Sequence, residues 1–152
     1  MIVFIDDQAP VWFFLLEAVY GGNIPTNDLK IFRNYSAFIK DFEAKSQEYE
    51  AIKALVLDIR APEQNGQLRF KDGSVIDLMP SFEGLGFLGG IGQKPSLSLL
   101  EEVPKVILTQ LSIDKQMRHD CMLYGIKENH IFDKYNREDL IELRDFLKQA
   151  LR

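Results

Sequence analysis

Short apolar runs alternate with longer stretches of helical character along most of the chain. Five runs have the length and composition of buried β-strands, and they span residues 1–5, 29–32, 54–59, 106–109 and 131–132. Helices are predicted between and after them, from Pro10 to about Tyr20, from an N-cap at Ser36 to about Glu50, from about Ile113 to Tyr124, and after an N-cap at Asn136. Strands that alternate with helices form βαβ units. The pattern therefore predicts an α/β fold, a three-layer sandwich around a five-stranded parallel sheet.

Residues 67–83 interrupt this alternation. Two runs with period-2 alternation flank Lys71-Asp72-Gly73, and Asp-Gly between such runs is a strong hairpin signal. We therefore predict a β-hairpin inserted after the third strand. The next segment, residues 84–92, has five glycines in nine positions, so a helix there is expected to be weak. Its G-x-G-x-x-G match is not assigned to a dinucleotide, because residues 80–83 separate it from any preceding strand.

The composition is that of one globular domain, to which we assign residues 1–152. A net charge of −5 and an isoelectric point near 5.1 argue against nucleic acid as the main partner. The longest apolar stretch, residues 11–20, is interrupted by Glu17 and is too short for insertion across a membrane. Cys121 is the single cysteine, so no intramolecular disulfide can form, and a cytoplasmic location is expected.

The predicted first helix is apolar on nearly all sides between Val11 and Tyr20. A helix that flanks a sheet needs only one apolar stripe. Either the inserted segment covers the remaining apolar surface, or that surface binds a partner or a second copy of the chain, giving a homodimer.

Acidic side chains follow two of the predicted strands. Asp6 and Asp7 close the first strand, and Asp58 lies near the end of the third. If these strands are neighbours, the three carboxylates converge at one sheet edge, where Mg²⁺ would relieve their repulsion. Thr109 and Lys134 close the next two strands and would point to the same edge. Each residue alone is explained by solvation of a strand end, but together they form a phosphoryl-binding set.

Four segments in order, FIDDQ, LVLDIRAPEQNG, ILTQ and FDKY, resemble the receiver domain of two-component response regulators. The most specific match is the spacing of Asp58, Pro62 and Gly66. The resemblance covers nearly the whole chain apart from the predicted hairpin. It implies the flavodoxin-like receiver fold, a phosphohistidine donor on a histidine kinase or histidine phosphotransfer protein, and a downstream protein partner or onward phosphotransfer.

The resemblance also implies a role for each site residue. Asp58 would be the phospho-acceptor, Thr109 would bond the attached phosphoryl group, and Lys134 would pair with Asp58 and then with that group. The Mg²⁺ ligands would be Asp6, Asp7, Asp58 and the backbone carbonyl of Arg60. Whether such a self-phosphorylating acceptor, with its own dephosphorylation, counts as an enzyme stays open.

Three positions depart from the family pattern. Tyr135 stands where the family usually has proline, Gln110 where it has a small residue, and Ile131 where it has an aromatic residue. These changes keep a second interpretation open, a phosphorylation-independent adaptor that retains the fold and has lost the switch.

A third interpretation, a Mg²⁺-dependent phosphohydrolase of another α/β family, ranks last. It would need an activated water or a second acid two residues after the nucleophile. Arg60 occupies that position after Asp58, and Gln8 occupies it after Asp6.

Overall fold

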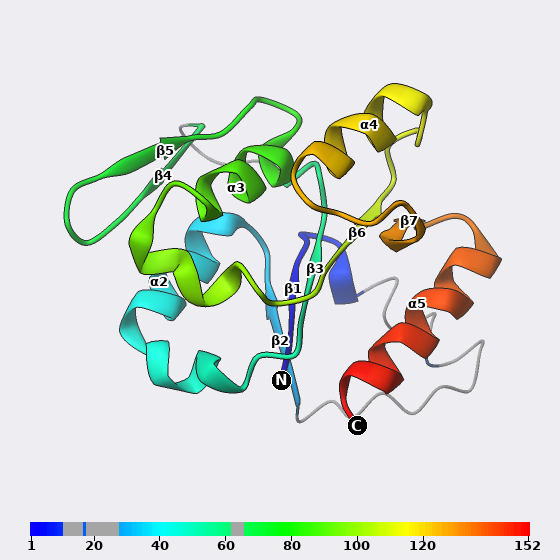
Figure 1. The fold of residues 1–152 in the computed structure, drawn as a ribbon, viewed down its shortest axis with the longest axis horizontal. Coiled ribbons are helices and arrows are strands. Elements are labelled where there is room, and N and C mark those ends of the chain that lie inside the picture. The colour runs from blue at the N-terminus through cyan, green and yellow to red at the C-terminus, as the bar shows by residue number, and fades with distance from the viewer. Residues whose placement is uncertain (11–16, 18–27, 62–65) are drawn as a thin grey trace.

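Five parallel strands form the central sheet of the computed structural model, which describes residues 1–10, 17, 28–61 and 66–152 (Figure 1). The strands are β1 (Ile2–Ile5), β2 (Leu29–Phe32), β3 (Ala54–Leu57), β6 (Lys105–Thr109) and β7 (Ile131–Asp133). They lie in the order β2-β1-β3-β6-β7, and every neighbouring pair is parallel. The predicted five-stranded parallel sheet is confirmed, and β1 and β3, which precede the acids, are neighbours.

Helices cover both faces of this sheet (Figure 1). Val3, Ile5, Leu55 and Leu57 face α2 (Tyr35–Ala44), α3 (Glu83–Ile91) and α4 (Lys115–Leu123), and Cys121 of α4 is fully buried in the same cluster. The alternate residues of the strands pack on the other face against α5 (Arg137–Ala150). This period-2 division gives the predicted three layers. The predicted first helix lies almost wholly outside the described residues. The structure therefore tests neither of the two explanations for its apolar surface.

The N-cap of α2 is Asn34, and the prediction of Ser36 was wrong. The Asn34 side chain accepts a hydrogen bond from the Ala37 N–H at 2.8 Å, and asparagine caps helices as well as serine does. The helix also ends earlier than predicted, at Ala44. It is followed by a 3₁₀ helix, Ser46–Ala51, in which Tyr49 stays buried. Two further 3₁₀ helices, Pro95–Leu100 and Glu128–His130, precede β6 and β7.

The predicted β-hairpin lies between β3 and α3. Strands β4 (Gln67–Arg69) and β5 (Val75–Asp77) pair antiparallel, and Gly73 in the turn has a positive φ of 85°. The Lys71 N–H donates to the Glu43 carboxylate of α2 at 3.1 Å, and the Lys71 ammonium donates to the Glu43 carbonyl at 3.1 Å. The hairpin is therefore tied to α2 as well as to its own chain neighbours.

The glycine-rich segment forms α3, where the sequence led us to expect only a weak helix. The glycines allow close approach that a larger residue would block. A Cβ added at Gly84 would lie 2.5 Å from the Asp58 carbonyl oxygen, and one at Gly90 would lie 2.6 Å from Ile76 of the hairpin. Tertiary packing here outweighs the low helix propensity of glycine, which costs roughly 1 kcal/mol per residue.

The last third of the chain follows the predicted boundaries closely. Asp114 caps α4 by accepting from the Met117 N–H at 2.8 Å, and Gly125, with a φ of 85°, follows its end. Asn136 caps α5 by accepting from the Asp139 N–H at 3.1 Å, as predicted. Across the described part of the chain, none of the helices combines the length and apolar character needed to cross a membrane.

Candidate functional site

The carboxyl ends of β1, β3, β6 and β7 meet at one edge of the sheet and bring the predicted site residues together. Asp6 and Asp58 directly follow β1 and β3, Thr109 is the last residue of β6, and Lys134 follows β7. All four side chains are buried, whereas Asp7 is exposed beside them. Parallel pairing alone explains this convergence, because the same end of every strand lies at the same edge.

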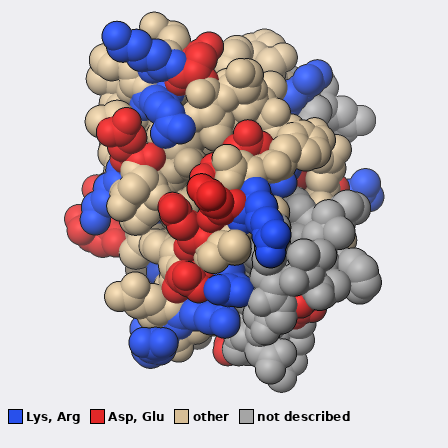
Figure 2. Space-filling view, turned by 90° about the vertical axis from the view of Figure 1, so that its right-hand side faces the viewer, with Lys and Arg blue, Asp and Glu red and all other residues tan. Residues whose placement is uncertain are grey.

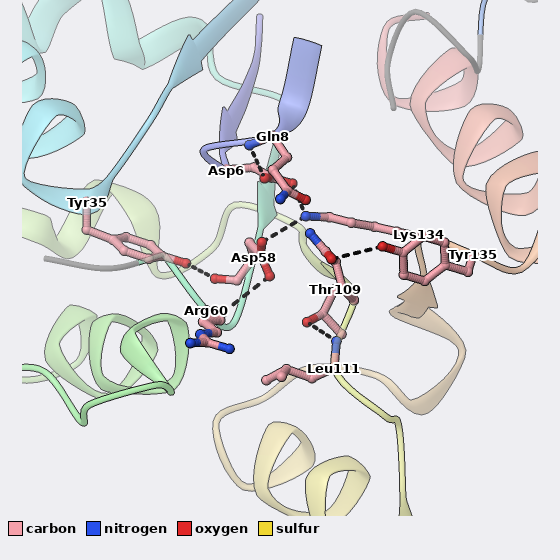
Figure 3. A network of polar contacts seen from close by, with 10 residues as sticks. Asp6, Gln8, Tyr35, Asp58, Arg60, Thr109, Leu111, Lys134 and Tyr135 are labelled. Atoms are coloured by element: carbon pink, nitrogen blue, oxygen red, sulfur yellow. Dashed lines mark hydrogen bonds and ion pairs between the residues drawn. The ribbon is translucent and has the colours of Figure 1, made fainter. Parts of the chain in front are cut away.

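The Lys134 ammonium lies between two buried carboxylates (Figure 3). Its Nζ is 2.7 Å from Oδ2 of Asp6 and 2.8 Å from Oδ2 of Asp58, and each of the three side chains is at most 4% exposed. Burial disfavours the charged amine, but attraction to Asp58 and hydrogen bonds to Asp58 and Asp6 outweigh it and raise the pKa of Lys134 above 10.5. The lysine therefore stays charged at neutral pH.

The carboxyl group of Asp58 is a much weaker acid than an ordinary aspartate. Burial and the charge of Asp6 raise its pKa to about 6, against the opposing effects of Lys134 and the Arg60 N–H. That N–H lies 3.3 Å from Oδ1 of Asp58. Near neutral pH, additional positive charge at this position would therefore stabilise the ionised form of Asp58.

Carboxylate oxygens of Asp6, Asp7 and Asp58 all lie within 4.8 Å of one another. The Gln8 N–H donates to Oδ1 of Asp6 at 2.8 Å and fixes that carboxylate in the turn after β1. The carboxylate oxygens of these three residues, of which Asp7 is exposed, are suited to binding a hard divalent cation. The three predicted acids are thus close enough to share one ion.

A cavity of about 410 Å³ opens beside Asp7 and Asp58. It is lined by Asp7, Gln8, Asp58, Arg60, Thr109, Gln110 and Leu111. The Thr109 hydroxyl oxygen accepts from the Leu111 N–H at 3.2 Å, so it is held in the turn that follows β6. The Lys134 N–H donates to the Thr109 carbonyl at 3.0 Å and ties the ends of β6 and β7 together. The cavity has room for a phosphoryl group beside Asp58.

Two positioning contacts at this edge were missed by the sequence analysis. The Tyr35 hydroxyl, at the start of α2, donates to the backbone carbonyl of Asp58 at 2.6 Å (Figure 3). The Gly84 N–H donates to the Ile59 carbonyl at 2.8 Å. They fix the two successive carbonyl groups of Asp58 and Ile59, just after β3. No spacing in the sequence links Tyr35 or Gly84 to β3, because the contacts depend on how α2 and α3 pack.

The face that carries α5 has no broad field of one charge among its described residues. Figure 2 shows acidic and basic side chains lying beside one another over this face. Tight binding to a phosphate backbone depends on an extended basic surface, and the described residues of this face do not form one.

The strand order and the helices on both faces match the flavodoxin-like fold that receiver domains adopt. A search of solved structures finds the same fold in the crystal structure of the Mn²⁺-bound form of the response regulator Rcp1. The TM-score is 0.57 with 20% identity over 97% of this chain and 91% of that chain. No protein-family model and no curated protein matches the chain. The resemblance predicted from the sequence is therefore confirmed at the level of the fold.

Proposed function

We propose that this chain is a receiver of two-component signalling and that Asp58 accepts a phosphoryl group from a phosphohistidine donor. The observation that carries the proposal is the buried Asp58 carboxylate, which is paired with Lys134 and faces the cavity lined by Thr109. The Rcp1 structure supports it, since that protein is a response regulator with the same fold. Burial of the groups in a low-dielectric site strengthens their electrostatic interaction with a transferred phosphoryl group.

A divalent cation belongs to this proposal, and Mg²⁺ is the ion we assign. The carboxylates of Asp6, Asp7 and Asp58 and the backbone carbonyl of Arg60 would hold it, and the three clustered carboxylates fit a hard cation. When bound, the cation supplies positive charge beside the phosphoryl oxygens. Rcp1 in its Mn²⁺-bound form supports a divalent cation site in this fold.

The residues of the site have separate tasks in the proposed transfer. A carboxylate oxygen of Asp58 attacks phosphorus, the new P–O bond forms as the P–N bond breaks, and the electron pair returns to the donor imidazole. Lys134, already 2.8 Å from Asp58, balances the negative charge of the aspartyl phosphate. The Thr109 hydroxyl leaves the Leu111 N–H and turns to a phosphoryl oxygen. That movement shifts the turn after β6 and changes the surface that a partner reads.

The wider setting is inferred from the same assignment. A histidine kinase or histidine phosphotransfer protein donates the phosphoryl group, and a downstream protein partner or a further phosphotransfer carries the signal. Residues 1–152 act as one receiver with the hairpin insertion at 67–83. The free, fully buried Cys121 suits a reducing, cytoplasmic setting.

The test is intact mass after incubation with acetyl phosphate and Mg²⁺, beside an Asp58→Asn variant and an EDTA control. We expect one added phosphoryl group that requires both Asp58 and the cation. A chain that takes up no phosphoryl group and forms no complex with beryllofluoride would overturn the proposal. That result would favour the phosphorylation-independent adaptor. Steady release of phosphate from small esters would favour the phosphohydrolase.

A further inference from the structure

Two of the residues that depart from the family pattern contact each other at the mouth of the site. The Tyr135 hydroxyl donates a hydrogen bond to Oε1 of Gln110 at 3.0 Å (Figure 3). Gln110 directly follows Thr109, and Tyr135 directly follows Lys134, so the pair spans the turns after β6 and β7. The Tyr135 side chain is 77% exposed, and burial therefore does not explain its position.

The main chain holds Tyr135 in place relative to β6. The Lys134 N–H donates to the Thr109 carbonyl at 3.0 Å, and the Tyr135 N–H donates to Oδ1 of Asp133 at 2.8 Å. With its backbone held by these two hydrogen bonds, Tyr135 presents its hydroxyl from a defined position. The hydrogen bond to Gln110 then restricts the carboxamide, which would otherwise rotate freely on an exposed turn.

A carboxamide has one accepting end and one donating end. Since Oε1 of Gln110 accepts from Tyr135, Nε2 is the end of the carboxamide that can donate to another acceptor. Gln110 lines the same cavity as Asp58 and Thr109. A phosphoryl group on Asp58 would bring strong acceptor oxygens into that cavity.

We propose that Gln110 donates from Nε2 to a phosphoryl oxygen on Asp58, and that Tyr135 is a positioning residue that orients the Gln110 carboxamide. The inference rests on the proposed function, because it concerns the phosphorylated site. The Gln110 carboxamide would be the third group to donate to the phosphoryl oxygens, beside the Lys134 ammonium and the Thr109 hydroxyl. It also gives two departures from the family pattern one joint task at the site.

The experiment measures the apparent affinity of the full chain for beryllofluoride at saturating Mg²⁺, by fluorine NMR titration. The variants are Gln110→Leu, Tyr135→Phe and the double substitution. We expect Gln110→Leu to weaken binding roughly tenfold, since hydrogen bonds to charged groups contribute at about this level. Tyr135→Phe should weaken it roughly threefold. The double variant should bind no more weakly than Gln110→Leu, because an absent carboxamide needs no orientation.

Two further readouts separate this role from a structural one. The midpoint of thermal unfolding and the affinity for Mg²⁺ alone should not change in any of these variants. Gln110→Glu keeps an acceptor for Tyr135 but loses the donor and adds negative charge, so it should weaken beryllofluoride binding more than Gln110→Leu does.

The matched controls are Gln116→Leu and Tyr124→Phe, on and directly after α4. Gln116 pairs with Asp120 at 2.9 Å, and Tyr124 is 40% exposed, so both resemble the test residues without lining the cavity. Neither control should alter binding. If the wild-type chain binds no beryllofluoride and takes up no phosphoryl group, the proposed function falls and this inference falls with it. If the wild type binds and Gln110→Leu binds equally well, only the role of Gln110 is refuted. Additive losses in the double variant would refute the orienting role of Tyr135.

Discussion

The Tyr35 phenol donates a hydrogen bond of 2.6 Å to the backbone carbonyl of Asp58. Tyr35 is fully buried at the start of α2, and its ring packs on Phe87 of α3 at 4.7 Å between centroids. Asp58, the proposed phosphoryl acceptor, is therefore held through its main-chain carbonyl as well as through its carboxylate. The phenol belongs to the support of the site, because it contacts the main chain of Asp58 and Tyr35 is not among the residues that line the cavity.

Tyr35→Phe should lower stability and slow phosphoryl uptake. The substitution keeps the aromatic packing and removes the hydroxyl from a buried carbonyl, so the free energy of unfolding should fall by about 1–3 kcal/mol. Urea unfolding measures the first effect, and intact mass against time with acetyl phosphate measures the second. Tyr124→Phe is the control, since its ring is partly exposed. Equal stability of Tyr35→Phe and wild type would show that the 2.6 Å contact contributes nothing.

Asp58→Asn should stabilise the metal-free chain in a pH-dependent way. The pKa of Asp58 is raised from 3.8 to about 6 in the folded state, so ionisation of this group favours the unfolded chain. This destabilisation is fully present above pH 6 and disappears below about pH 4, where the carboxyl group is protonated in both states. The free energy of unfolding of the variant should therefore exceed that of wild type by about 1–3 kcal/mol at pH 7.5. This difference should shrink as the pH falls from 6 to 4.

Thermal and urea unfolding in EDTA over that pH range check this prediction. Lys134 retains Asp6 as its partner in the variant, so its ammonium is not left without a carboxylate. A gain in stability that is the same at pH 4 and pH 7.5 would contradict the assignment of the raised pKa to Asp58.

Lys134→Ala should destabilise the chain strongly, and divalent cations should reverse part of the loss. Removal of the ammonium leaves the buried carboxylates of Asp6 and Asp58 without its compensating charge. Breaking a buried pair in this way costs about 3–5 kcal/mol. Because Mg²⁺ would replace the lost charge, it should raise the midpoint of unfolding more in the variant than in wild type. The exposed Lys127→Ala is the control, and an equal response to Mg²⁺ in all three chains would count against a shared cation site.

Gly84→Ala should disturb the site from the neighbouring helix. The added methyl would lie 2.5 Å from the Asp58 carbonyl oxygen and 2.9 Å from the Ile59 Cα, so α3 or the end of β3 must shift. Overpacking of this kind lowers the free energy of unfolding by about 1–3 kcal/mol. Gly92→Ala, with no atom within 4 Å of the new Cβ, should be neutral or stabilising by about 0.5 kcal/mol. Similar midpoints of urea unfolding for the two variants would show that the close approach at Gly84 has no energetic importance.

The strands and the acidic sheet edge were predictable because they depend on local pattern and on topology. A run such as residues 54–57 is buried on both faces, and the predicted bounds agree closely with β3. Once parallel pairing is accepted, Asp6, Asp58, Thr109 and Lys134 must share one edge. Nothing beyond strand order was needed to bring these side chains together.

The features that could not be predicted depend on packing between elements that are distant in sequence. The helix at Glu83–Ile91 forms although its glycines lower helix propensity, because Gly84 and Gly90 allow contacts with β3 and the hairpin. The cap at Asn34 was missed because serine and asparagine are nearly equal N-caps, so composition could not choose between them. The contact between Gln110 and Tyr135 joins two turns that were each noted as unusual, and their pairing required the register of β6 and β7.

Cys121 gives the chain a native chemical probe of local opening. Its thiol is fully buried in α4, and burial raises its pKa to about 11, so thiol reagents should react with it only when the helix separates from the sheet. Helix α4 begins a few residues after Leu111, in the turn that the proposed switch would move. The rate of alkylation at this single sulfur atom would therefore report, without any introduced label, how often that part of the molecule opens with and without a phosphoryl group on Asp58.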